Sequence, residues 1–594
     1  MSGAGRGVRG WLVALVCAAT LCSAAPPTTR TITQLKIGQK GIGRTVFQGE
    51  KIETFDFEIV DLLKSDGFNA DMILIKVSGP KVDAIGGIAY GMSGSPLYID
   101  NDLIGAVAMT TADTDAHYGY ATPIADMMKL WDTLPTRPNA TIGQAGPLDL
   151  LPAGTPVTIR GLSGRALAPL ARLLTARGLK VQAGPTPTPP KPTPAQPIDP
   201  AQPSEAAIEP GSAISCALTT GDVAVEATGT VTWRDGSKVL AFGHPFLRGG
   251  ASSLFMERAY VAAILPSHTM PTKVAFPSSG PVGTFTVDRN AGIGGVIGEK
   301  TPRFEVSITV RDTNLNRERV LRLDVVRDVR LVPALVGTAL LQAMDEVMDR
   351  EGAGTASISW KLDADGLAAP FVREDLVYSN ADIMSEAVSG PLFGLEALLR
   401  NDFAAVEPKR IDLTVNVSDE RRTVRLTGLQ VDPAKAKPGQ SVKVTCQLQP
   451  YRGQPFQREL LMVVPRTAPA GRLVVDVHGR DRAGTGPVNQ AALLAGGLPV
   501  PTSLADLLKT VAASQRGDML WAEILSPEAA AARQQASDQL ATLPTADPFG
   551  EETVSVPTLD LPTGATAVPL AKAEARLDKV VLGRLRESLT VIAP

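Results

Sequence analysis

The sequence predicts a mainly β protein that is divided into several domains. A chain of 594 residues is long enough to hold three or four domains, each with a core of its own. Residues 31–126 and 209–330 contain short apolar runs that alternate with glycine-containing turns, which is typical of antiparallel strands. Nine prolines fall between Pro185 and Pro203, too many for packed structure, and they predict an extended linker between the two β-rich regions.

The remaining boundaries follow from changes in the apolar pattern. Apolar residues recur at helical spacing in Val332–Arg350 and Ala381–Arg400, although Gly390-Pro391 is expected to interrupt the second helix. Short strands and turns between Asp412 and Val477 predict a β-sandwich of immunoglobulin type. The predicted segments are a signal peptide (1–25), a β lobe with a small strand–helix–strand extension (31–184), a linker (185–208), a second β lobe (209–330), a helical connector (331–404), the sandwich (405–500), and a helical and tail region (501–594).

The first 25 residues are typical of a secretory signal. Arg6 and Arg9 form a positive region, Trp11–Leu21 an apolar region, and Cys22–Ala25 a small-residue exit. A secreted, periplasmic or cell-envelope protein is therefore expected, and an uncleaved N-terminal anchor is the alternative. No later segment has about eighteen uninterrupted apolar residues, so no other membrane span is predicted.

Charge and cysteine usage restrict the partners and cofactors. Without the first 25 residues the chain holds 56 basic and 61 acidic residues and shows no basic face, so nucleic acid is not an expected partner. Beyond the signal only Cys216 and Cys446 remain, and they either form one disulfide or stay as two buried thiols. The histidines and cysteines lack the spacing of metal ligands, so neither a metal nor a cofactor is predicted.

The hexapeptide Gly91-Met92-Ser93-Gly94-Ser95-Pro96 is the strongest candidate for chemistry. Glycines at positions 91 and 94 allow backbone conformations that other residues rarely adopt. A tight turn of this kind exposes one hydroxyl, so Ser93 is the candidate nucleophile, and the N–H groups of Gly91 and Ser93 are the candidate oxyanion hole. The alternative is a Gly/Ser/Pro loop that only joins two strands.

A serine nucleophile needs a base to take its proton and a third group to orient that base. The candidate bases are three histidines: His244 at the end of a predicted strand, His117 in a loop after the serine turn, and His268 in an exposed segment. Asp288 follows His244 by 44 residues and is the favoured orienting carboxylate, ahead of Asp83. Each of these side chains also has a plain structural interpretation as a surface or turn residue.

Two parts of the chain closely resemble one known family. Gly86–Pro96 with Leu103–Val107, and separately Gly229–His244, are similar to the serine and histidine segments of the SpoIVB serine peptidase family, known from a sporulation signalling protease. The resemblance implies a chymotrypsin-like core of two β-barrel lobes. It also implies that Ser93 is the nucleophile and that His244 is the general base.

The chain departs from the family's pattern in two ways. The resemblance covers about residues 35–130 and 208–300, and the serine segment comes first here, whereas in the sporulation protease it follows the histidine segment. The core is therefore expected to be permuted, with the proline-rich linker joining its lobes. The family's catalytic aspartate lies fifteen residues before its serine, where this chain has Ser78. The acid is either supplied elsewhere, with Asp288 favoured, or missing.

Together these observations predict a secreted SpoIVB-like serine endopeptidase that cleaves a protein or peptide through an acyl-enzyme. Ser93, His244 and Asp288 are its predicted catalytic residues. The sandwich and the helices are expected to position substrate or to attach the protein to the cell envelope, and no oligomeric state is predicted. The alternative is a catalytically inactive envelope scaffold or binding protein that retains the peptidase fold.

Overall fold

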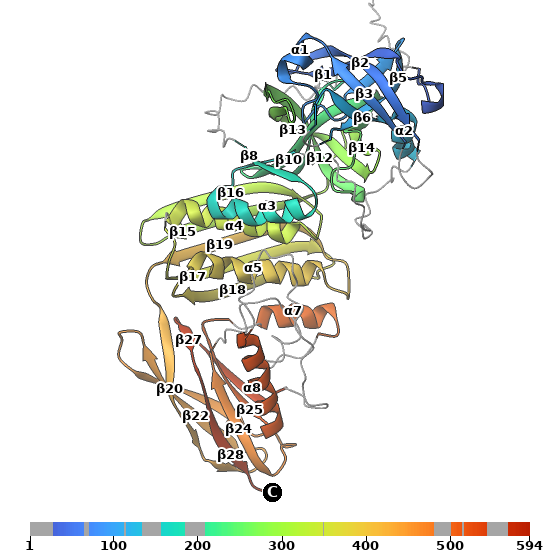
Figure 1. The fold of residues 1–594 in the computed structure, drawn as a ribbon. Helices are drawn as coiled ribbons and strands as arrows, with labels where there is room; N and C mark the ends of the chain where they lie inside the picture. Colours follow the sequence, from blue (N-terminus) through green and yellow to red (C-terminus); the bar gives the residue numbers. More distant parts are fainter. Residues whose placement is uncertain are drawn as a thin grey trace, which may run out of the picture.

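The structure is a computed structural model, in which the described parts of the chain form three successive layers along one long axis (Figure 1). In Figure 1 two β-barrels lie at one end, a sheet covered by helices lies in the middle, and a β-sandwich lies at the other end. The predicted signal peptide and residues 185–207 of the predicted linker lie outside the described residues. The structure describes residues 28–64, 71–111, 114–132, 156–184, 208–348, 350–479, 501–513, 516–542 and 568–593.

The first barrel is built from six strands that close on themselves. Its core follows the two-residue period of a strand, as in β2, where Phe55, Phe57 and Ile59 all point inward. Three short helices flank it: η1 (Ile32–Gln34), α1 (Pro80–Ile85) and α2 (Ile124–Asp132). The strands, in their order around the barrel, are β1 (Lys40–Val46), β2 (Ile52–Leu63), β3 (Met72–Ser78), β6 (Tyr118–Pro123), β5 (Asp102–Met109) and β4 (Pro96–Ile99).

A second ring of six strands lies beside the first. Strand β9 pairs with both β10 and β12, so the pairing returns to its starting point and closes the ring. Two adjacent barrels fit the expected chymotrypsin-like architecture, and the prediction of a mainly β fold is confirmed. The strands, again in order, are β9 (Ala213–Gly221), β12 (Gly250–Leu265), β13 (Thr272–Arg289), β14 (Gly292–Ile297), β11 (Lys238–Ala241) and β10 (Ala224–Asp235).

The predicted strand–helix–strand extension is present as β7 (Pro156–Arg160), α3 (Gly164–Ala176) and β8 (Lys180–Ala183). Its position differs from the predicted division, which assigned it to the first lobe. Strand β7 pairs with β10, so the extension belongs to the sheet of the second barrel. The reason is that β10 continues beyond its pairing with β11 and offers its backbone to β7.

The second ring is part of a larger sheet of 13 strands, and the middle layer is formed by the strands of that sheet that continue from β9. The helices α4 (Val332–Met348) and α5 (Ile383–Leu399) pack against its strands and share their core (Figure 1). Both helices were predicted, but α5 runs through Pro391 without the expected interruption, because its apolar side chains are buried and tertiary packing overrides local propensity. The strands are β16 (Arg317–Val326), β15 (Arg303–Asp312), β19 (Glu407–Ser418), β17 (Gly354–Asp365) and β18 (Phe371–Ser379).

The C-terminal unit is a β-sandwich of two sheets that share one core. It draws strands from residues 519–591 as well as from the predicted range. Helix α8 (Pro527–Thr542) packs against this sandwich, whereas α7 (Leu504–Ala513) packs against α5 and β18 and buries Leu507 and Val511 in the core of the middle layer. One sheet contains β23 (Phe456–Val463), β22 (Ser441–Pro450), β20 (Thr423–Asp432) and β27 (Val580–Leu582). The other contains β21 (Lys435–Ala436), β28 (Arg584–Val591), β24 (Gly471–His478), β25 (Met519–Leu525) and β26 (Ala571–Arg576).

The two cysteines outside the signal are separate buried thiols. Cys216 lies in the core of the large sheet and Cys446 in the core of the sandwich, and both are free. Burial raises the pKa of each thiol, so neither is a reactive thiolate at neutral pH. None of the helices in the described ranges combines the length and apolarity needed to span a bilayer.

Two buried carboxyl groups face the same region of the second barrel. Glu226 on β10 pairs with Arg160 of β7, with 3.0 Å between Oε1 and Nε. Glu257 on β12 forms no ion pair of its own within the described residues, and burial, followed by the negative charge of Glu226, raises its pKa to about 8, although Arg160 lowers it in part. The Glu257 carboxyl is therefore protonated in the folded protein at neutral pH.

We predict that Glu257 makes the protein less stable as the pH rises from about 4.5 to about 8. In this window the folded state retains a proton that the unfolded chain releases, so stability is lost as the pH rises through the folded pKa. Urea unfolding at pH 5 and pH 8.5 measures the difference. Glu257→Gln should flatten it, whereas Glu299→Gln on the surface should leave it unchanged. Equal pH dependence in wild type and Glu257→Gln would contradict the assignment.

Candidate active site

The serine turn is packed directly onto the second barrel. Gly91 and Gly94 have φ angles of +92° and +91°, in the region that favours glycine. A side chain at position 94 would also not fit, because a Cβ there would lie 2.0 Å from the Thr230 carbonyl oxygen and 2.5 Å from the Phe242 nitrogen. The second glycine of the motif is therefore required by the contact between the barrels.

Two threonines of β10 hold the backbone of this turn. The Thr230 N–H donates to the Ser93 carbonyl over 2.7 Å, and the Thr230 hydroxyl donates to the Gly91 carbonyl over 3.2 Å. The Thr232 hydroxyl donates to the Gly94 carbonyl over 2.8 Å. All three donors are buried, so water competes little with these bonds. The second barrel thus fixes the conformation of the serine turn, which belongs to the first.

The turn leaves two backbone donors without partners. The N–H of Met92 donates to Ala89 and that of Gly94 donates to Val107, whereas the N–H groups of Gly91 and Ser93 make no hydrogen bond in the described part of the chain. These are the two groups that the sequence predicts as an oxyanion hole. An oxyanion hole requires donors that the fold itself does not satisfy.

His244 follows β11 at the barrel interface. The hydroxyl of Thr122 in the first barrel donates to the Gly243 carbonyl over 2.6 Å, which fixes the backbone before the imidazole. The His244 Nδ1 lies 2.8 Å from the Pro245 carbonyl oxygen. Because a carbonyl can only accept, this bond assigns the proton to Nδ1 and leaves Nε2 as the acceptor. Burial lowers the pKa of His244, so the neutral imidazole is the populated form at neutral pH.

Ser93 and His244 line one narrow hollow between the barrels, together with Gly91. The hollow has a volume of about 20 Å³, enough for little more than a single water molecule. The other lining residues are apolar or uncharged: Ile88, Ala89, Tyr90, Val107, Ala108, Met109, Thr110 and Pro156. The structure therefore brings together the predicted nucleophile, base and oxyanion donors from segments 151 residues apart.

Asp288 does not occupy the predicted place behind the imidazole. Its Oδ1 accepts from the Phe246 N–H over 2.8 Å, and its Oδ2 accepts from the N–H groups of Leu247 and Gly249 over 2.6 and 3.2 Å. Burial raises the pKa of Asp288, and these bonds offset only part of the rise. The carboxyl group therefore holds the loop that follows His244, while the Pro245 carbonyl is the partner of the ring.

The other predicted candidates lie outside the lining of this hollow. His117 lies between two carboxylates of the first barrel, with Nδ1 2.7 Å from Asp115 and Nε2 3.5 Å from Asp83. His268 is in the connection between β12 and β13, where its carbonyl accepts from the Ala116 N–H. Ser78, at the position of the family's aspartate, ends β3.

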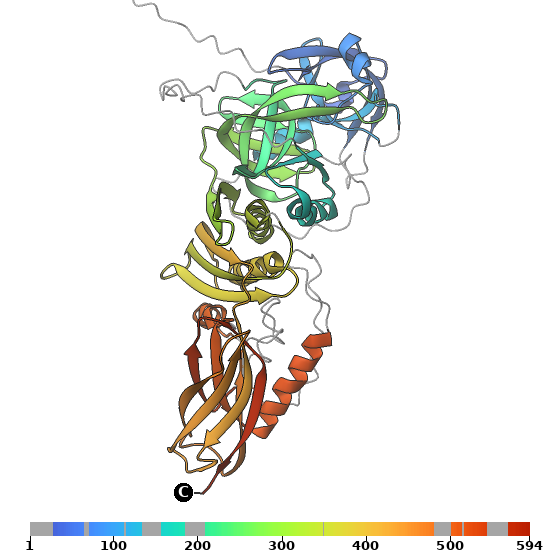
Figure 2. The same ribbon diagram turned by 90° about the vertical axis from the view of Figure 1, so that its left-hand side faces the viewer.

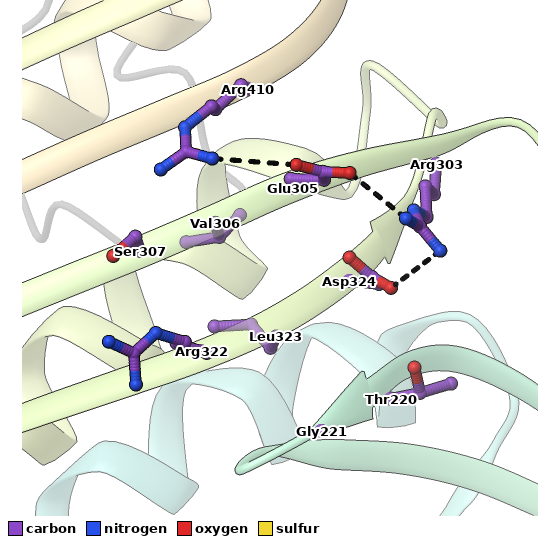
Figure 3. Close-up of a pocket in the computed structure, with 10 residues that line it drawn as sticks. All are labelled: Thr220, Gly221, Arg303, Glu305, Val306, Ser307, Arg322, Leu323, Asp324 and Arg410. Carbon is purple, nitrogen blue, oxygen red and sulfur yellow. Dashed lines mark hydrogen bonds and ion pairs between the residues drawn. The ribbon is translucent and has the colours of Figure 1, made fainter. Parts of the chain in front are cut away.

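A larger hollow of about 300 Å³ lies over β9, β15, β16 and β19 and carries several charges (Figure 3). Arg303 pairs with both Glu305 and Asp324, at 3.1 and 3.4 Å, and Arg410 lies 3.7 Å from Glu305. These charges largely neutralise one another, and the lining contains no histidine or cysteine. The candidate active site is therefore the smaller hollow beside Ser93.

Sequence reasoning missed the residues that hold the site together. Thr230 and Thr232 alternate along β10, and their spacing places both side chains on one face of the strand. This alternation was visible in the sequence and could have indicated two threonines on one face of a strand. It lies in the segment that resembles the family's histidine region. Their partners are backbone carbonyls of a distant turn, and no local pattern identifies those.

We predict that Asp288→Ala destabilises the protein by about 2–5 kcal/mol, because it leaves up to three buried N–H groups without an acceptor. Urea unfolding measures the change. Asp235→Ala, at the exposed last residue of β10, is the control and should change stability by less than about 0.5 kcal/mol. An Asp288→Ala variant as stable as the control would show that the carboxyl does not hold the loop.

One family model matches the chain, that of the SpoIVB peptidase S55 family, over residues 12–128. The match contains the serine turn and ends before the segment that carries His244. No curated protein and no solved structure is similar enough to match the chain. The serine turn and the first barrel both lie within the matched residues. The N-terminal part of the chain, residues 12–128, is therefore similar to the SpoIVB peptidase S55 family.

Proposed function

We propose that the protein is a serine endopeptidase in which Ser93 is the nucleophile and His244 is the general base. The proposal is supported by the common hollow, which Ser93 and His244 both line together with Gly91, and by the N–H groups of Gly91 and Ser93, which have no partner among the described residues. The family match supports peptidase chemistry in general, and the two residues supply the roles that acyl transfer requires.

The proposed reaction begins with attack of the Ser93 hydroxyl on a peptide carbonyl. Nε2 of His244 takes the hydroxyl proton, and the N–H groups of Gly91 and Ser93 stabilise the negative oxygen. His244 then gives the proton to the leaving amine, and the peptide bond breaks to form an acyl-enzyme. Water, activated by the same nitrogen, hydrolyses the ester and restores the Ser93 hydroxyl.

The hydrogen-bond partner of the His244 Nδ1 determines how fast we expect peptide hydrolysis to be. In the proposed transition state the imidazole is positively charged, and the Pro245 carbonyl stabilises it with a dipole rather than with a full negative charge. Triads that lack a functioning acid lose about four orders of magnitude in kcat but still exceed the uncatalysed rate. We therefore expect slow turnover, as in an enzyme that cleaves few bonds.

A non-catalytic scaffold is the second candidate function. Two observations favour it: the carbonyl partner of the His244 Nδ1, and a hollow too small for a peptide without movement of its walls. In this case the two barrels would serve as a binding module, and the Ser93 hydroxyl would have ordinary reactivity. Covalent labelling separates the two functions, since it requires an activated serine.

A fluorophosphonate probe tests the proposal. The wild-type chain should be labelled at Ser93, because the probe reacts with an activated hydroxyl and its phosphoryl oxygen occupies the oxyanion hole. Ser93→Ala should abolish labelling, and His244→Gln should slow it by about 10³-fold or more. Ser95→Ala is the matched control, because this buried serine belongs to the same turn and its hydroxyl faces Thr230. Labelling that persists in Ser93→Ala, or is absent from the wild type, would favour the scaffold.

We also propose that the protein is exported from the cytoplasm. The support is the signal-like sequence of residues 1–25, with its charged, apolar and small-residue regions. N-terminal sequencing of the protein from a bacterial host should give a mature chain that begins after Ala24 or Ala25. A full-length cytoplasmic chain would contradict this.

A further inference from the structure

A long hairpin of the second barrel reaches across to the serine turn. Strands β12 and β13 extend beyond their own barrel and contact the first one (Figure 2). Gly49 and Val261 exchange two backbone hydrogen bonds of 2.7 and 3.0 Å. Nearer the tip, the Ser267 N–H donates to the Ile85 carbonyl over 3.0 Å. The hairpin is thus attached to the first barrel at the connection between β1 and β2 and at the end of α1.

The hairpin forms hydrogen bonds with Tyr90, whose carbonyl shares a peptide unit with the Gly91 N–H, a proposed oxyanion donor. The Tyr90 N–H donates to Pro271 over 2.8 Å, and the Lys273 N–H donates to the Tyr90 carbonyl over 3.0 Å. The Tyr90 carbonyl and the Gly91 N–H belong to one trans peptide, so they point in opposite directions. A bond that draws the carbonyl toward the hairpin therefore turns the Gly91 N–H away from it and leaves that N–H without a partner.

The side chain of Lys273 also packs against the peptide unit between Tyr90 and Gly91. A Cβ at position 91 would lie 3.0–3.3 Å from the Cδ, Cβ and Cγ atoms of Lys273, so the lysine stem fills the space that Gly91 leaves. At the end of the stem, Nζ donates to the Thr45 hydroxyl of β1 over 2.9 Å. Both side chains are buried. Lys273 is therefore fixed at its backbone, along its stem and at its tip.

A lysine is a poor choice for stability at this position. Nζ forms no ion pair with a carboxylate of the described residues, and burial alone lowers the pKa of Lys273 to about 7. A buried ammonium without a counter-charge is costly, whereas a methionine of similar length would fill the same space without that cost. A buried titratable group with a shifted pKa beside a candidate active site is itself a candidate functional residue.

We propose that Lys273 is a positioning residue for the oxyanion hole, through which docking of the second barrel sets the direction of the Gly91 N–H. This inference rests on the proposed serine peptidase function. It implies that the serine turn is competent only when the β12–β13 hairpin is in place, so the two barrels must dock before the hole is complete. Lys273 does not line the hollow and contacts no reacting atom.

The test combines kinetics with hydrogen exchange in the full-length protein. Hydrolysis of p-nitrophenyl acetate gives kcat and KM, and hydrogen exchange followed by mass spectrometry reports on the peptide that covers residues 85–95. We expect Lys273→Ala to lower kcat by about 30–100-fold with KM changed less than about threefold, since a displaced oxyanion donor acts on the transition state. Lys273→Met, which keeps the stem but loses the bond from Nζ to Thr45, should recover only part of this loss. Thr45→Val should resemble Lys273→Met.

Lys238→Met, on an exposed position of β11, is the matched control and should leave kcat and exchange unchanged. Exchange in residues 85–95 should accelerate in Lys273→Ala at an unchanged melting temperature. A kcat within twofold of wild type, or an effect on KM alone, would overturn the proposal. If the wild type is inert toward the ester and the fluorophosphonate, the peptidase function fails, and unchanged exchange in Lys273→Ala would separately overturn the positioning role.

Discussion

The contact between the serine turn and β10 is the constraint on which the rest of the site depends. Gly94 lies so close to the Thr230 carbonyl that no side chain fits, and the two threonines of β10 take up the carbonyl groups of the turn. The two remaining donors, the N–H groups of Gly91 and Ser93, belong to residues that line the same hollow as His244. Neither barrel contains a complete site, because each supplies groups that only the other orients.

The same contact does not depend on the order of the two segments along the chain. The site requires that the turn after α1 meet the end of β11, and it places no demand on which segment comes first. The site differs from a full catalytic triad mainly in the group that contacts the imidazole, which is a carbonyl and not a carboxylate. The carboxyl of Asp288 is used within the second barrel to hold the loop after His244, so the imidazole depends on the Pro245 carbonyl for its orientation.

The sequence predicted those features that local chemistry determines. The glycines of the serine turn, the histidine at a strand end and the apolar helix α4 each follow from patterns within a few residues. The role of Asp288 could not be predicted, because a buried carboxylate is recruited by whichever N–H groups the fold brings to it. Helix α5 continues through Pro391 since packing outweighs propensity, and the strands from residues 519–591 complete the sandwich by long-range pairing that spacing does not encode.

The central claim is that two barrels bring Ser93, His244 and two backbone donors to one point. A crystal structure of the protein treated with a peptide boronate tests it most directly, because boron mimics the tetrahedral intermediate. We expect boron bonded to the Ser93 oxygen, one boronate oxygen about 3 Å from the N–H groups of Gly91 and Ser93, and Nε2 of His244 within hydrogen-bond distance. A boronate attached elsewhere, or a Ser93 adduct directed away from His244, would contradict the account.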